Sequence, residues 1–121
     1  MEGNVSALLG RIVWAEIADH NGHRKLRPVI VVGVAQTDDS QDFLTVAAVT
    51  SRVPDVLPED HVALPWHPQR HPRTGLNRPS AVVCSWRTAI MTSDIPEIAG
   101  IVPKREFVEI LTKIAELESK P

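Results

Sequence analysis

The sequence of 121 residues contains very little cysteine and no long hydrophobic run. Its one cysteine, Cys84, cannot form a disulfide within the chain, which is typical of a reducing compartment. Cys84 lies in the apolar run AVVCSW, so we expect a buried, inert thiol rather than a nucleophile. The segment MEGNVSALLG lacks the features of a signal peptide, and no run approaches the roughly 20 apolar residues of a membrane span. We therefore expect a soluble, cytoplasmic protein.

The sequence also lacks the patterns that indicate a metal site. It contains no cysteine pair and no His-x-x-x-His motif on an expected helix. His67 and His71 are separated by a proline-containing loop segment rather than placed on a regular face. We expect neither a metal nor a cofactor.

Acidic residues are absent from two segments, 20–37 and 61–93. The formal net charge is −2, so a protein coated with positive charge for nonspecific nucleic-acid binding is excluded. If both segments lie at one rim of the fold, they form a positive groove that attracts phosphates. Trp66 at the edge of such a groove would stack on an unpaired base, and the favoured alternative is that it anchors the loop. The basic residues of the two segments are Arg24, Lys25, Arg27, Arg70, Arg73, Arg78 and Arg87.

Short β-branched runs between turn signals predict a mostly β fold with a C-terminal helix. The expected pattern is a small barrel or strongly curled sheet, such as an SH3-like barrel, formed by a single domain over 1–121 with an N-terminal extension at 1–9. The C-terminal helix is expected at 103–118, with an apolar face of Phe107, Ile110, Leu111, Ile114 and Leu117. The expected strands are 11–17, 27–34, 43–51, 61–65, 80–86 and 100–103.

Arg27 and Thr50 stand at neighbouring ends of two consecutive expected strands. In an antiparallel pair these ends lie side by side, which brings a guanidinium and a hydroxyl together. Such a pair suits cleavage of RNA, because the 2′-hydroxyl is the internal nucleophile and the protein only positions and neutralises the phosphate. The alternative is that Arg27 caps the strand against a carboxylate.

Histidines near this pair are candidates for proton transfer. His20 and His23 precede Arg27, and His67 and His71 lie in the longer basic segment. A neutral imidazole can move protons near neutral pH, and the alternative for each histidine is an ordinary loop residue.

Five stretches in order, GRIVWAEI, KLRPVIVV, VAAVTS, TGLNRPSAVVCSW and GIVPKREFVEILTKI, resemble the MazF/PemK family of toxin endoribonucleases from type II toxin–antitoxin systems. The resemblance implies a MazF/CcdB-type fold, a homodimer and metal-independent cleavage of single-stranded RNA at short sequences. It also implies a cognate antitoxin with an extended segment that covers the groove. Arg27 and Thr50 match the catalytic positions of the family, and Ser51 extends the same hydroxyl corner.

The sequence departs from the family pattern at several positions. Ser85 and Trp86 stand where relatives often carry an acidic residue and a glutamine, and Arg11 and Pro79 stand where relatives often carry an acid. Two other classes of function stay open at this point. One is a noncatalytic barrel that binds a protein partner, like the gyrase-poisoning toxins of related fold, and the other is a nucleic-acid-binding module without catalysis.

Overall fold

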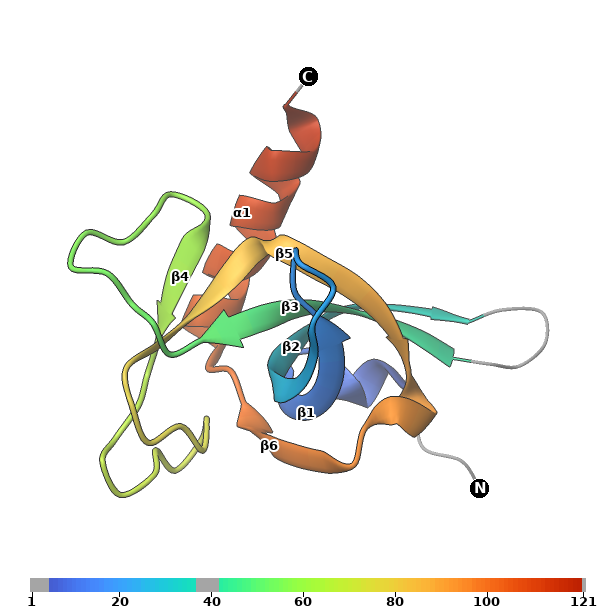
Figure 1. Ribbon diagram of the computed structural model, residues 1–121, viewed down its shortest axis with the longest axis horizontal. Coiled ribbons are helices and arrows are strands. Elements are labelled where there is room, and N and C mark those ends of the chain that lie inside the picture. The colour runs from blue at the N-terminus through green and yellow to red at the C-terminus, as the bar shows by residue number, and fades with distance from the viewer. Residues whose placement is uncertain (1–4, 37–41, 121) are drawn as a thin grey trace.

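Six antiparallel strands form one sheet in the order β4-β5-β3-β2-β1-β6 (Figure 1). The computed structural model describes residues 5–36 and 42–120, so the expected extension at 1–9 lies partly outside the described residues. A mostly β fold with a C-terminal helix is confirmed. The elements are η1 Val5–Leu8, β1 Arg11–Ala18, β2 Arg24–Gln36, β3 Asp42–Thr50, β4 His61–Leu64, β5 Ser80–Met91, η2 Thr92–Asp94, β6 Glu97–Ile101 and α1 Lys104–Ser119.

The continuous apolar run in β2 is explained by two hydrophobic clusters on opposite faces of the curled sheet. Ile30 enters the cluster that also contains Ile12 of β1, whereas Val29 and Val31 enter the cluster that contains Val13. Successive side chains of a strand point to opposite faces, so a strand covered on both sides is apolar at every position. The centre of β2 is therefore fixed from both sides.

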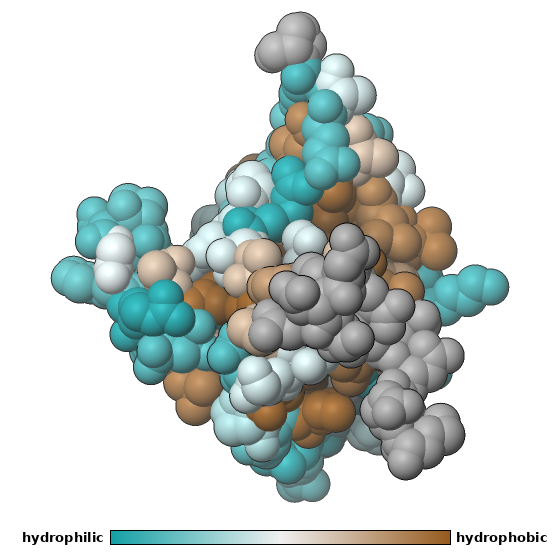
Figure 2. Space-filling model, turned by 90° about the vertical axis from the view of Figure 1, so that its right-hand side faces the viewer, coloured by the Kyte–Doolittle hydropathy of each residue, from teal (hydrophilic) through white to brown (hydrophobic). Residues whose placement is uncertain are grey.

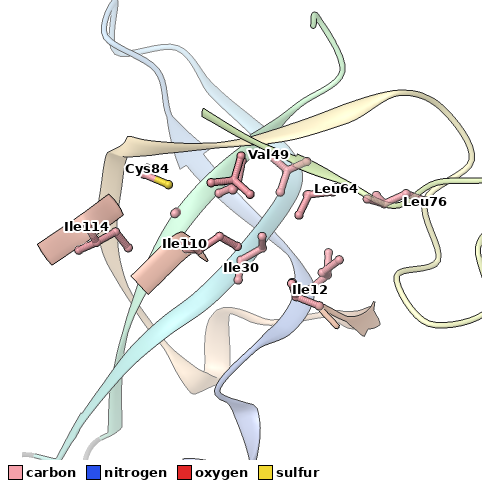
Figure 3. Close-up of a cluster of buried hydrophobic side chains, with 12 residues drawn as sticks. Ile12, Ile30, Val49, Leu64, Leu76, Cys84, Ile110 and Ile114 are labelled. Atoms are coloured by element: carbon pink, nitrogen blue, oxygen red, sulfur yellow. The ribbon is translucent and has the colours of Figure 1, made fainter. Parts of the chain in front are cut away.

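Helix α1 covers the first of these clusters. Ile110 and Ile114 are buried in it and point toward the strands, with Cys84 of β5 among their neighbours (Figure 3). The prediction that Leu111 belongs to the buried face is wrong, because its side chain is 41% exposed. Val108 is exposed as well, and the face shown in Figure 2 carries apolar surface beside the helix. Among the described residues, no helix has the length and apolarity needed to cross a membrane.

Strands β2 and β5 are several residues longer than the sequence pattern predicts, and the strand expected at 100–103 begins earlier and ends earlier, at Glu97–Ile101. The loop expected at 18–25 is shorter, because β2 begins at Arg24 and pairs with β1 from Ala18 onward. Strand β5 continues to Met91, where it pairs with Phe43 of β3. The hydrogen bonds of the antiparallel ladders extend these strands beyond their apolar segments, into polar residues that the pattern does not mark.

The pairing of β5 with β3 contains a bulge. Ala47 pairs with Arg87 and Ala48 with Val83, so the pairing skips the three residues 84–86 of β5. A bulge bends the strand and redirects its side chains. This bulge places Trp86 on the side of the sheet where the ends of β2 and β3 meet.

A backbone contact joins the β6 edge of the sheet to the loop 65–79 between β4 and β5. The N–H of Ile101 donates to the carbonyl of Arg73 at 2.8 Å, and the loop lies beside β6 in Figure 1. Gly100 is required there, because a Cβ on it would lie 2.3 Å from the Arg73 carbonyl oxygen. The loop therefore lies against β6 and forms one wall of the site described next.

Candidate functional site

A groove of about 1090 Å³ runs between the ends of β2 and β3, the β1–β2 hairpin, the loop 65–79 and β6. The basic side chains outnumber the two acidic ones, Asp19 and Glu97. The groove therefore attracts anions, and a polyanion long enough to follow it is the ligand that its charge favours. The basic residues that line it are Arg24, Lys25, Arg27, Arg52, Arg70 and Arg78.

Arg27 and Thr50 both line this groove, on adjacent strands. The ladder between β2 and β3 ends at the pair Val29 and Ala48. Arg27 lies two residues before Val29 and Thr50 two residues after Ala48, so both lie at the same end of these two strands. The structure thus brings together the two residues that the sequence singles out. Both are partly exposed, so both can reach a ligand in the groove.

The guanidinium of Arg27 stacks on an aromatic ring. Its Cζ lies 4.7 Å from the centre of the Trp86 ring, which is the geometry of a cation–π interaction. The Nε of Arg27 is buried and makes no hydrogen bond to any described residue. Trp86 donates its indole N–H to the carbonyl of Ala18 at 3.3 Å, which ties the ring to the end of β1.

The hydroxyl of Thr50 organises the turn that follows β3. Thr50 Oγ1 accepts the backbone N–H of Arg52 at 3.1 Å. This turn places Ser51 and Arg52 in the lining of the groove. The sequence pattern does not indicate Arg52, because it lies outside the two acid-free segments.

The β1–β2 hairpin brings His20 and His23 to the groove, where both are exposed. The Asp19 carboxylate accepts the backbone N–H groups of Asn21 at 2.9 Å and His23 at 3.0 Å, which fixes the turn. Desolvation acts to raise the pKa of Asp19, but these two N–H groups and the two histidines outweigh it and leave that pKa lowered. The carboxylate therefore stays ionised beside the histidines.

Arg24 and Lys25 also reach the groove from the beginning of β2. Arg24 makes an exposed ion pair with Glu16 at 3.1 Å and donates a second hydrogen bond to the Glu16 carbonyl. The exposure of this pair keeps it weak, so the guanidinium can turn toward a bound phosphate.

The loop 65–79 contributes Arg70, Asn77 and Arg78 to the groove. Arg70 has a φ of 78°, a conformation that is rare for a residue with a side chain. The loop is held by its own histidines: His67 Nδ1 accepts the N–H of Gln69, and His71 Nδ1 accepts the N–H groups of Arg73 and Thr74.

Five of the residues selected from the sequence lie outside the lining of the groove. His67 and His71 bond to the backbone of their own loop, and Trp66 is 41% exposed. Arg87 forms an ion pair with Glu118 of α1 at 2.7 Å instead. The five residues outside the groove lining are Trp66, His67, His71, Arg73 and Arg87.

Comparison with known proteins identifies the family of this chain. Residues 9–117 match the family model described as PemK-like, MazF-like toxin of type II toxin–antitoxin system. The chain belongs to this toxin family. The family assignment made from the five sequence stretches is confirmed, and toxins of this family are endoribonucleases.

Solved structures of toxins share the fold. MazF of Deinococcus radiodurans is 21% identical with a TM-score of 0.69, and the match covers 93% of this chain and 96% of that one. The Mycobacterium tuberculosis toxin MazF-mt6 is 21% identical with a TM-score of 0.65, covering 92% and 98%. A mycobacterial endoribonuclease in complex with its cognate antitoxin is 17% identical with a TM-score of 0.63, covering 94% and 96%. The comparison with curated proteins gave no match.

Trp86 lines the groove of this toxin, but the sequence alone does not indicate its role there. In the sequence, Ser85 and Trp86 stand out only as a departure from the family pattern. The contact between Trp86 and Arg27 joins strands that are far apart in the sequence, and it depends on the bulge in β5.

Among the described residues, no three side chains of the His, Cys, Asp and Glu types gather in a way that could hold a metal ion.

Proposed function

We propose that this toxin cleaves single-stranded RNA at short sequences bound in the groove, without a metal ion. The observation that carries the proposal is that Arg27 and Thr50, at the same end of two adjacent strands, both line a groove with six basic side chains. A phosphodiester in that position meets a planar guanidinium and a hydroxyl from two adjacent strands. Guanidinium is the group best suited to bind phosphate oxygens in pairs.

In the proposed mechanism the 2′-hydroxyl of the RNA attacks the adjacent phosphorus. The bond from O2′ to phosphorus forms and the bond from phosphorus to O5′ breaks, which gives a 2′,3′-cyclic phosphate and a 5′-hydroxyl. Arg27 neutralises the charge that builds on the phosphate oxygens and orients the leaving oxygen. Thr50 holds the phosphate by a hydrogen bond, and Ser51 extends this corner.

One proton must leave the 2′-hydroxyl and one must reach O5′. His20 or His23 is the proposed group for these transfers, because both line the groove on the hairpin fixed by Asp19. The backbone bonds to His67 and His71 give these two histidines a role in their own loop, which favours the hairpin histidines.

The proposed partners are single-stranded RNA, a cognate antitoxin and a second copy of the chain. Structural neighbours include a mycobacterial endoribonuclease in complex with its cognate antitoxin and the MazE–MazF complex of Deinococcus radiodurans. An acidic, extended antitoxin segment would fit the positive groove and exclude RNA from it. We place the toxin in the cytoplasm, where its RNA substrate and the reduced state of Cys84 are found.

The test is incubation of the purified protein with a long single-stranded RNA in EDTA, followed by mapping of the product ends. We expect discrete cuts with cyclic phosphate and 5′-hydroxyl ends from the wild type and from R105A, and no cuts from R27A. Arg105 is an exposed residue of α1 outside the groove, so R105A removes the same charge elsewhere.

Replacement of the 2′-hydroxyl by hydrogen at one mapped site should abolish cleavage there, and cleavage that persists would exclude the mechanism. If no RNA is cut, salt-sensitive binding would instead support a noncatalytic RNA-binding protein. Loss of RNA binding as well would favour the protein-binding alternative.

A further inference from the structure

We propose that Trp86 is a positioning residue for Arg27: its indole ring fixes the direction of the guanidinium without neutralising its charge. The inference rests on the proposed function, in which Arg27 acts on the phosphate. The Cζ of Arg27 lies 4.7 Å from the ring centre, within the range where the ring quadrupole attracts a cation. An arginine side chain has several rotatable bonds, so a catalytic guanidinium must be held by something.

The usual way to hold an arginine is a carboxylate, but within residues 5–36 and 42–120 no carboxylate forms an ion pair with Arg27. The ion pairs found among the described residues involve Arg24, His61, Arg87 and Lys120. The buried Nε of Arg27 likewise has no acceptor within the described part of the chain. A carboxylate would orient the guanidinium but cancel much of its charge, whereas an indole face leaves that charge available for the phosphate.

The position of Trp86 is itself built into the fold. Asp60 lies just before β4, and its carbonyl accepts the N–H of Cys84 at 2.8 Å. The Asp60 carboxylate accepts the hydroxyl of Ser85. These bonds hold the first two residues of the bulge, and the third, Trp86, turns toward Arg27 and bonds to Ala18. The two residues before Trp86 and its indole N–H are thus all held by hydrogen bonds, which restricts the orientation of the ring.

A measurement that needs no catalysis tests the geometry. Because Arg27 Nε is buried, its N–H should exchange slowly with water and give a resolved signal in a ¹H–¹⁵N spectrum, assigned by its loss in R27K. The ring current of Trp86 should shift this signal upfield. We expect W86F to keep most of the shift and W86L to remove it. An Arg27 signal that is unchanged in W86L would overturn the proposal.

Kinetics test the functional part. W86L should slow single-turnover cleavage by roughly 2- to 30-fold, the range expected for loss of a cation–π contact, while W86F should retain most of the rate. The dissociation constant for RNA with a 2′-deoxy cut site should change less than about threefold. If Trp86 stacked on a base instead, that constant would rise roughly 5- to 150-fold and the proposal would be wrong.

A double-mutant cycle separates action through Arg27 from a general structural effect. In the R27K background, W86L should cost much less in rate than in the wild type, because a compact ammonium has no plane for the ring to orient. An equal loss in both backgrounds would show that Trp86 acts elsewhere. If the spectrum behaves as expected and the wild type cuts no RNA, the proposed function fails while the positioning geometry stands.

Discussion

The hydroxyl of Thr50 accepts the backbone N–H of Arg52 across 3.1 Å and lines the same groove as Arg27. The bond to Arg52 uses an oxygen lone pair, so the hydroxyl hydrogen can still be donated to a phosphate oxygen. We expect T50V to lose at least tenfold in single-turnover cleavage and T50S to stay within about threefold, since only serine keeps both bonds.

The same pair of variants separates catalysis from folding. T50V should lose about 1 kcal/mol in urea unfolding, because one hydrogen bond of the turn is gone. A loss of cleavage that disappears when stability is restored by lower temperature would assign Thr50 a structural role alone.

Salt dependence should distinguish residues of the groove from other surface charges. Each phosphate contact to single-stranded RNA adds about 0.7 to the slope of log K against log salt concentration. R78A should therefore reduce that slope by about 0.7, whereas R105A, outside the groove, should leave it unchanged. Filter binding to 2′-deoxy-substituted RNA over a salt series measures both. Equal slopes for R78A and the wild type would place the RNA elsewhere.

Acid should weaken the support of the bulge. The hydrogen bond from the Ser85 hydroxyl has the largest effect on the pKa of Asp60 and lowers it, and His61 lowers it further. Burial acts to raise this pKa but is outweighed, so the pKa lies below its ordinary value of 3.8. A carboxyl whose pKa is lowered in the folded state stabilises the fold at every pH above its ordinary pKa. This stabilisation is lost as the pH falls through the lowered pKa. S85A should cost about 1 kcal/mol at pH 7 and progressively less below about pH 4.

Urea unfolding from pH 7 to pH 2.5 measures this difference. S119A is the matched control, because the Ser119 hydroxyl donates to the carbonyl of Glu116 rather than to a carboxylate. Its effect should be constant with pH. A constant effect of S85A would show that Asp60 and Ser85 are not coupled through ionisation.

The thiol of Cys84 should be inert in the folded protein. Its side chain is fully buried, and burial raises its pKa from 9.0 to about 11. Only the thiolate is nucleophilic, so this shift alone lowers the reactive fraction at pH 8 about a hundredfold. Iodoacetamide should modify Cys84 at least a hundredfold more slowly in buffer than in 8 M urea, a rate ratio followed by mass spectrometry. Similar rates would mean that the core under α1 opens readily.

The sequence was sufficient to predict the pair Arg27 and Thr50 because their proximity follows from local connectivity. When two consecutive strands pair antiparallel, the start of the first lies beside the end of the second, whatever the rest of the fold is. Arg27 is near the start of β2 and Thr50 ends β3. The apolar face of α1 was predictable for the same reason, since it depends on helical periodicity, and only Leu111 was placed wrongly.

The remaining features depend on contacts that no local pattern encodes. The second half of β5 is partly polar and exposed, and its ladder with β3 alone makes it a strand. Trp86 reaches Arg27 through a bulge held by Asp60. The Nδ1 atoms of His67 and His71 fold the loop 65–79 by accepting backbone N–H groups, a role that the sequence pattern does not indicate.

That folded loop has a thermodynamic consequence for binding. Hydrogen bonds inside it, the buried Thr74 and the contact of Gly75 with Ala99 fix the backbone that carries Arg70 and Arg78. Because this backbone is already fixed in the free protein, a ligand that enters the groove loses less binding free energy to the conformational entropy of the loop. The unfavourable backbone conformation of Arg70 lowers the free energy of unfolding, but it does not lower the free energy of ligand binding.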